Sequence, residues 1–194
     1  MAPRMIVVGG PPGSGKSTAL PVRSFGIDAF NVDDRCRELH GSYQRIPREI
    51  RARASSECEV FVSNHIEAGL DFAVETTMRT SIAIEQARTA RPRGFTTILF
   101  FLAAGDANIH VERVRARAFA GGHAAPEAEI RATYVASIAM LPEAIRAFDV
   151  VECLDTTVHN SAPRWVASAR AGEISLRGEP TPPWLQPALR RAAL

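Results

Sequence analysis

A glycine-rich segment that directly follows a short apolar run constrains the fold more than any other part of the sequence. Residues 10–17 read GPPGSGKS and come after the apolar residues 5–8. The segment fits the pattern G-x-x-x-x-G-K-[ST], in which a buried strand leads through a glycine loop into a helix. The competing interpretation is a glycine-rich turn with a chance lysine. Lys16 is the only lysine among the 23 Lys and Arg residues, which argues against chance.

The composition of this loop indicates that it binds phosphate through its backbone. Pro11 and Pro12 have no N–H, so the amides from Gly13 to Thr18 should form the anion cradle. The amine of Lys16 would bridge the outer phosphates, and the hydroxyl of Ser17 would ligate Mg²⁺. We therefore expect ATP or GTP as the phosphoryl donor. The expected nucleotide-binding residues are Gly10, Gly13, Ser14, Gly15, Lys16, Ser17 and Thr18.

Apolar runs and helical patterns alternate along the rest of the chain. Strands are expected at 5–8, 29–32, 72–75, 96–103 and 149–154, with helices at 47–68, 80–91, 107–120 and 126–148. This alternation predicts a three-layer α/β fold of the nucleotide-kinase type, with a mainly parallel five-stranded sheet. We expect a core at 1–155 that includes a helical lid at about 106–147. Residues 156–194 should form a hairpin and a closing helix packed on the core, with Trp165 and Trp184 as packing anchors.

Composition and charge exclude several classes of protein. No apolar run approaches the roughly 20 residues of a membrane span, and the first residues do not resemble a secretory signal. The three cysteines, Cys36, Cys58 and Cys153, are widely spaced, which favours buried thiols in a cytoplasmic protein. A formal net charge of +2 argues against a nucleic-acid-binding protein.

Polar residues follow the second and third expected strands, where they can meet the phosphate loop. The carboxyl ends of parallel strands share one edge of a sheet, so Lys16, Asp33 and Glu75 should converge there. Asp33 is our candidate for the base that accepts a proton from an acceptor hydroxyl, with helix capping as the alternative. Glu75 should either bind substrate hydroxyls or support Mg²⁺ through water. Arg79 could clamp an anionic group of the acceptor or be a solvated arginine.

An arginine-rich helix and the glycine-containing loop after it are consistent with a lid. Arg113 and Arg117 lie four residues apart and should share one helix face. Closing such a lid would bring an arginine onto the transferring phosphoryl group. His123 lies in the loop and should hold its shape or touch a ligand. The alternative is an ordinary helical hairpin with a solvated arginine face.

Taken together, the motifs resemble the zeta toxin family of P-loop kinases. The resemblance rests on GGPPGSGKST, the N-x-D at 31–33, ETTMR at 75–79 and RVRARAFAGGHAAPEAEIRATY at 113–134. The resemblance implies that this protein is a kinase that uses ATP and Mg²⁺ to phosphorylate a hydroxyl of a small molecule, such as UDP-N-acetylglucosamine. Asp33 then matches the base, and Arg113 or Arg117, with Arg131 as a third candidate, matches the arginine that stabilises transfer. Glu75, Thr77 and Arg79 match acceptor-binding residues, and we expect Asn31, His123 and Arg131 to bind the substrate as well.

Other functions stay open from the sequence. Kinases of antibiotics, metabolites or nucleic-acid ends share this architecture, and a nucleotide-dependent switch uses the same loop. A candidate base and acceptor pocket favour the kinase over the switch. An inhibitory antitoxin partner is also left open, because the chain is shorter than the toxins that have one.

Overall fold

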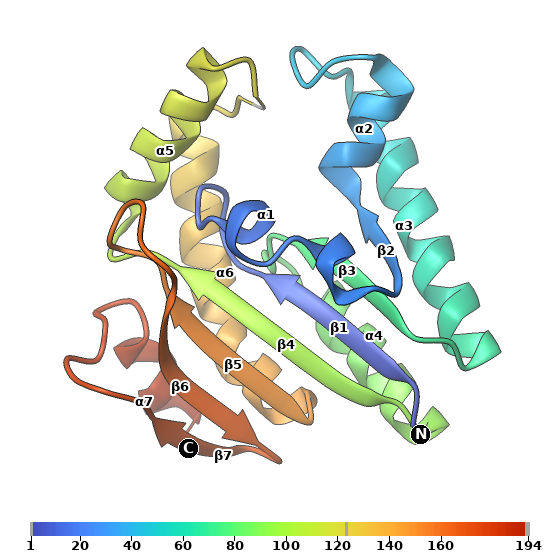
Figure 1. Cartoon of the computed structure of the whole chain (residues 1–194), viewed down its shortest axis with the longest axis vertical. Helices are drawn as coiled ribbons and strands as arrows, with labels where there is room; N and C mark the ends of the chain where they lie inside the picture. Colours follow the sequence, from blue (N-terminus) through green and yellow to red (C-terminus); the bar gives the residue numbers. More distant parts are fainter. Residues whose placement is uncertain (1, 123, 193–194) are drawn as a thin grey trace.

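The computed structural model describes residues 2–122 and 124–192, which form one α/β sheet domain (Figure 1). The strands and helices, in chain order, are β1 (Arg4–Gly9), α1 (Lys16–Ala19), the 3₁₀ helix η1 (Val22–Phe25), β2 (Asp28–Asn31), α2 (Val32–His40), α3 (Arg48–Ala68), β3 (Phe72–Thr76), α4 (Ile82–Ala90), the 3₁₀ helix η2 (Arg91–Arg93), β4 (Thr96–Ala103), α5 (Ala107–Phe119), α6 (Glu127–Ala147), β5 (Val150–Asp155), β6 (Arg164–Arg170), β7 (Glu173–Leu176) and α7 (Gln186–Ala192).

The sheet has the strand order β2-β3-β1-β4-β5-β6-β7. The first five strands in this order are parallel, as the sequence predicted, whereas β6 and β7 are antiparallel additions. The expected count of five strands is therefore corrected to seven for the part of the chain that the structure describes. The physical reason is that β5 would otherwise expose a row of unpaired N–H and C=O groups, which the hairpin β6–β7 satisfies along one side. This pairing joins the chain after Asp155 to the sheet of the core.

Helices cover the two faces of the sheet unequally. On one face, side chains of α3, α4, α6 and the start of α7 pack against the strands in a large apolar cluster that includes Phe72, Leu99 and Phe101. On the other face a smaller cluster contains Val22 of η1 and Phe25 packed beside it. In Figure 1 the helices α4 and α6 lie behind the sheet, and α2 and α5 stand on either side of its upper end.

The start of helix α2 differs from the boundary expected from the sequence. Val32 belongs to helix α2 rather than to the strand before it, since Asn31 caps the helix at that point. Helix α1 has only four residues, because Pro21 cannot continue it, and the chain proceeds through η1.

The cysteines and tryptophans only partly follow their expected roles. Cys36 and Cys153 are buried free thiols, whereas Cys58 is half-buried. Trp184 is buried as a packing anchor, and its indole N–H donates to a carboxylate oxygen of Asp155 at 3.0 Å. Trp165 is 40% exposed, and its ring packs edge-on against that of Phe100 with centroids 6.1 Å apart. Within the described chain, no helix has the length and apolarity that crossing a membrane requires.

Candidate active site

A cleft of about 1340 Å³ opens at the carboxyl ends of the parallel strands. In Figure 1, β1, β4 and β5 point toward this end, where α1 lies between α5 and α2. The walls of the cleft come from the phosphate loop, the starts of α2 and α4, the end of β3, helix α5 and the loop after β5. The cleft lining includes Lys16, Ser17, Asn31, Asp33, Glu75, Thr77, Arg79, Arg113 and Arg117. These residues are far apart along the chain, and the fold brings them together around one cleft.

Backbone crowding fixes the shape of the phosphate loop. Gly10 has a φ of +139°, and a Cβ there would lie 2.0 Å from the carbonyl oxygen of Leu102. Gly13 has a φ of +76°, and a Cβ there would lie 2.8 Å from the carbonyl oxygen of His110. Only glycine avoids both the left-handed backbone cost and these contacts. The loop therefore rests directly on the end of β4 and on helix α5.

The lone lysine is held inside this loop. Lys16 is 7% exposed, and its Nζ donates to the carbonyl oxygens of Gly10 at 2.6 Å and Pro11 at 3.1 Å. Burial lowers the pKa of Lys16, while the negative charges of Glu75 and Asp33 act in the opposite direction. An amine on a flexible stem reaches two carbonyl groups at one point, which a planar guanidinium does less well.

Ser17 and Glu75 form a second polar contact beside the lysine. The Ser17 hydroxyl lies 3.0 Å from both carboxylate oxygens of Glu75 and donates to that group. Burial raises the pKa of Glu75, and the charge of Lys16 and the Ser17 hydrogen bond counteract this rise. A hydroxyl and a carboxylate side by side are hard oxygen donors, which are the ligands that Mg²⁺ prefers.

The start of helix α2 separates the roles of its polar residues. The side-chain oxygen of Asn31 accepts from the N–H groups of Asp33 at 2.8 Å and Asp34 at 3.3 Å, so Asn31 is the helix cap. The capping alternative weighed for Asp33 is therefore wrong. The carboxylate of Asp34 accepts from the hydroxyl of Tyr43 at 2.8 Å, whereas Asp33 lines the cleft.

The loop between β3 and α4 adds the remaining polar groups of this wall. Met78, in a left-handed conformation with φ 54°, is 1% exposed and anchors the loop. The flanking residues Thr77 and Arg79 line the cleft. The backbone carbonyl of Thr77 accepts from the hydroxyl of Ser137 on α6, and Arg79 lies 3.8 Å from the carboxylate of Glu129. The loop between β3 and α4 thus lines the cleft and also contacts helix α6.

The candidate lid arginines occupy different environments. The guanidinium of Arg113 donates to the carbonyl oxygens of Thr156 at 2.6 Å and Thr157 at 3.3 Å, and to that of Gly13 at 3.4 Å. Arg117 is exposed, lines the cleft and acts through its charge on Lys16. These contacts tie Arg113 to the protein backbone and leave Arg117 at the wall of the cleft.

Arg131 does not line the cleft. Arg131 donates to Glu127 and to the side-chain oxygen of Asn108, both at 2.8 Å, and so links α6 to α5. His123 lies outside the described residues.

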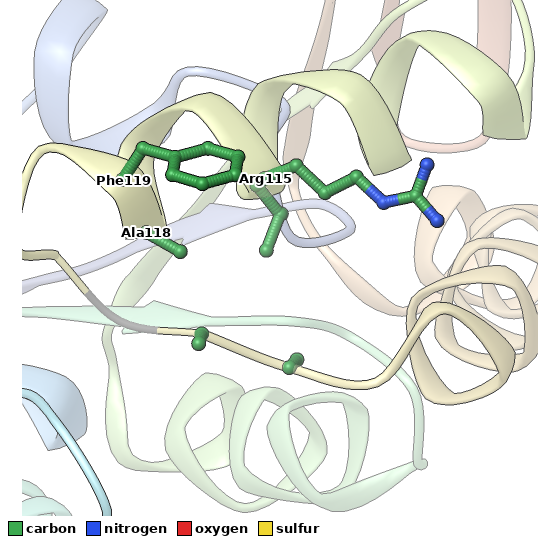
Figure 2. A pocket seen from close by; sticks show the side chains of 6 residues that line it. Arg115, Ala118 and Phe119 are labelled. Atoms are coloured by element: carbon green, nitrogen blue, oxygen red, sulfur yellow. The ribbon is translucent and has the colours of Figure 1, made fainter.

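A smaller groove of about 310 Å³ runs between α5 and residues 124–125 (Figure 2). Its lining is mostly apolar and includes Ala118 and Phe119, whose side chain is 93% exposed. Figure 2 shows the guanidinium of Arg115 extending away from the ring of Phe119, and Arg115 forms an ion pair with Glu127. This groove carries no cluster of polar groups.

The structure adds cleft residues that sequence reasoning missed. Helix α3 contributes Arg51, Cys58 and Glu59, and the loop at 156–163 forms the wall next to the phosphate loop. His110 contacts the phosphate loop from below. A single histidine inside an apolar helical pattern gives no sequence signal that separates it from a core residue. The loop after β5 could have been found, because it follows a parallel strand on the same edge.

Comparisons with known proteins agree with this architecture. A protein-family model described as an AAA domain matches residues 5–135, which is more than half of the chain. No curated protein matches the sequence. The fold is similar to a structure from the PezAT chromosomal toxin–antitoxin system of Streptococcus pneumoniae, with a TM-score of 0.62 and 18% identity over 98% of this chain and 86% of that chain.

The chain is also similar to a protein chain in structures of AvrRxo1-ORF1 in complex with AvrRxo1-ORF2. For the complex with sulphate ions the TM-score is 0.67 at 15% identity, covering 90% of this chain and 61% of that chain. For the complex with ATP the TM-score is 0.66 at 16% identity, covering 90% and 60%. At these identities the likeness shows the fold alone, which is an α/β fold of the P-loop kinase type.

Proposed function

We propose that this chain, which belongs to the AAA domain family, is an ATP-dependent kinase that transfers a phosphoryl group to a hydroxyl of a small molecule. One observation carries the proposal. A buried lysine of the phosphate loop, a hydroxyl–carboxylate pair and a further carboxylate border one cleft of about 1340 Å³. A cleft of that volume has room for a nucleotide and a second small molecule.

The donor side is the phosphate loop. The N–H of Ser14 donates to Pro11 at 3.2 Å and that of Thr18 donates to Gly15 at 3.1 Å. We expect the amides of Gly13, Gly15, Lys16 and Ser17 to meet the phosphates of ATP, with GTP as the alternative donor. The amine of Lys16 would exchange its two carbonyl partners for phosphate oxygens, which carry more negative charge.

Ser17 and Glu75 are the residues that would hold a magnesium ion. Their oxygen atoms lie 3.0 Å apart, and Glu75 is only partly exposed, so two oxygen donors lie close enough to share one small divalent cation. Bound magnesium supplies positive charge that offsets the charge developing on the phosphates. The contact with Ser17 favours this role for Glu75 over direct binding of acceptor hydroxyls.

Asp33 is the proposed general base. Its backbone N–H is fixed by the Asn31 cap at 2.8 Å, so the start of α2 aims the residue at the cleft. The acceptor oxygen would attack the terminal phosphorus of ATP, its proton would pass to the Asp33 carboxylate, and ADP would leave. Asp34, one residue further, is occupied by Tyr43 and takes no part.

Arg117 is the proposed arginine for charge stabilisation. It lies one helical turn beyond Arg113, lines the cleft and acts through its charge on Lys16. The guanidinium of Arg113 donates to three backbone carbonyl groups. Arg79 and Thr77 would contact the acceptor. The zeta toxin resemblance makes a nucleotide sugar such as UDP-N-acetylglucosamine the first acceptor to test. The similarity to the structure from the PezAT toxin–antitoxin system supports a search for an inhibitory protein partner.

The test is phosphoryl transfer from labelled ATP with Mg²⁺ to a panel of nucleotide sugars, antibiotics, nucleosides and oligonucleotides. Asp33→Asn should lower transfer by about 10²–10⁴-fold while ATP binding is kept. Asp34→Asn is the matched control and should transfer at the wild-type rate. Equal transfer by Asp33→Asn and wild type would refute the assignment of the base. ATP hydrolysis that no acceptor competes with, and that only a protein partner alters, would instead favour a switch.

A further inference from the structure

A histidine lies fully buried directly beneath the phosphate loop. His110 is in the first turn of α5 and is 0% exposed. Its Nδ1 lies 2.7 Å from the carbonyl oxygen of Pro12, and its Nε2 lies 3.1 Å from the backbone nitrogen of Ala104. A carbonyl only accepts and an N–H only donates, so Nδ1 must carry the hydrogen and Nε2 must accept. One neutral tautomer satisfies both partners.

The surroundings of the ring disfavour its charged form. Burial, together with the positive charges of Lys16 and Arg113, lowers the pKa of His110 to about 4. From α6, the ring of Tyr134 packs on the imidazole with centroids 5.0 Å apart. Protonation would also place a second donor against the N–H of Ala104. The ring therefore stays neutral across the pH range in which a kinase is assayed.

The hydrogen bond from His110 to Pro12 lies in the part of the phosphate loop that has few backbone donors of its own. Pro11 and Pro12 have no N–H, so this stretch of the loop lacks two of its own hydrogen-bond donors. Directly after it, the backbone of Gly13 rests on that of His110, close enough that a Cβ would lie 2.8 Å from the His110 carbonyl oxygen. The turn that follows then presents its amides to the cleft.

We propose that His110 is a positioning residue of the phosphate loop. Its Nδ1–H fixes the Pro12 carbonyl relative to the end of β4, and this sets the direction of the amides from Gly13 onward. The inference rests on the proposed function only in taking these amides to bind a nucleotide. Its consequence is that the first turn of α5 belongs to the nucleotide cradle rather than to a moving lid.

Two substitutions separate the two hydrogen bonds of the ring. In His110→Asn the amide nitrogen stands near the place of Nδ1, so the bond to Pro12 can be kept. In His110→Gln the amide oxygen reaches toward Ala104, and the bond to Pro12 is lost. His65→Gln is a matched control, because its Nδ1 also lies 2.7 Å from a backbone carbonyl, that of Phe61, far from the loop.

The measurement is the affinity for ATP and for inorganic tripolyphosphate by titration calorimetry at pH 7.5, without an acceptor. His110→Gln should weaken both affinities about tenfold or more, because a buried loop carbonyl loses its donor. His110→Asn should stay within about threefold of wild type, and His65→Gln should equal it. A purely structural role for His110 would lower the thermal stability of both variants and leave the affinity of the folded fraction unchanged, which would overturn the proposal.

A second measurement on the wild-type protein keeps the test decisive if a variant does not fold. Imidazole ¹⁵N spectra at pH 5 should contain one ring that is still neutral, with its hydrogen on Nδ1, and its signals should shift when ATP is added. A neutral ring with its hydrogen on Nε2, or no response to ATP, would contradict the proposal. A wild-type protein that binds ATP but phosphorylates nothing would contradict the proposed function and leave this inference standing.

Discussion

Acidification should destabilise the protein through His110, and the size of the effect can be worked out from its burial. The ordinary pKa of 6.5 applies in the unfolded chain, whereas burial lowers the pKa to about 4 in the folded protein. Above pH 6.5 both states are neutral at this ring, so it imposes no penalty on folding. As the pH falls below 6.5, the unfolded chain binds a proton that the folded protein excludes, and the free energy of unfolding falls.

The loss should be about 2 kcal/mol at pH 5 and about 3 kcal/mol at pH 4, since one pKa unit corresponds to about 1.4 kcal/mol. Urea unfolding of wild type and of His110→Asn at pH 7 and pH 5 measures it. Carboxylates titrate in both proteins, so their contributions cancel in the difference between the two. The stability advantage of wild type over the variant should shrink by about 2 kcal/mol between these pH values. An advantage of equal size at pH 7 and pH 5 would refute the neutral, buried imidazole.

Three further predictions concern the phosphate loop and the tail. Gly10→Ala should abolish ATP binding and destabilise the fold, because a Cβ would lie 2.0 Å from the Leu102 carbonyl oxygen. The control Gly41→Ala, at φ +82° with no atom within 4 Å, should lower the free energy of unfolding in urea by only about 1 kcal/mol. Lys16→Arg should reduce phosphoryl transfer at least about tenfold although the charge is kept, and wild-type rates would contradict the need for an amine. Trp184→Phe should lower the free energy of unfolding by about 1–3 kcal/mol, because a buried carboxylate loses its indole donor, and an unchanged value would show that this hydrogen bond contributes nothing.

The parallel half of the sheet could be predicted from the sequence because short apolar runs alternate there with helical patterns. The segment 96–103 was expected and found with the same bounds, since no helical pattern competes there. The pairing of β6 with β5 could not be predicted. A short amphipathic hairpin pairs with an open sheet edge or packs as a separate unit equally well by its local pattern, and the choice depends on which edge the rest of the fold leaves free.

The candidate site was predictable where chemistry and strand ends coincide, as for Lys16, Asp33 and Glu75. The site was not predictable where two side chains of the same type lie on one helix face and only their contacts in the fold distinguish them. Arg113 and Arg117 share one helix face in the sequence, and only the structure shows that the guanidinium of Arg113 donates to the backbone carbonyl of Thr156. His110 was missed because its role depends on a proline carbonyl 98 residues away in the chain.

The buried tryptophan of the tail gives this protein an optical reporter of its own nucleotide site. The indole N–H of Trp184 donates to Asp155, which also accepts from the hydroxyl of Thr157 at 2.7 Å. Thr157 lines the cleft beside the phosphate loop. Emission from a buried indole depends on the electric field at its ring, so a ligand that reorders Thr157 changes that emission through two hydrogen bonds. Trp165 is the other tryptophan in the chain, and replacing it with phenylalanine leaves Trp184 as a single fluorophore with which to follow nucleotide binding without a label.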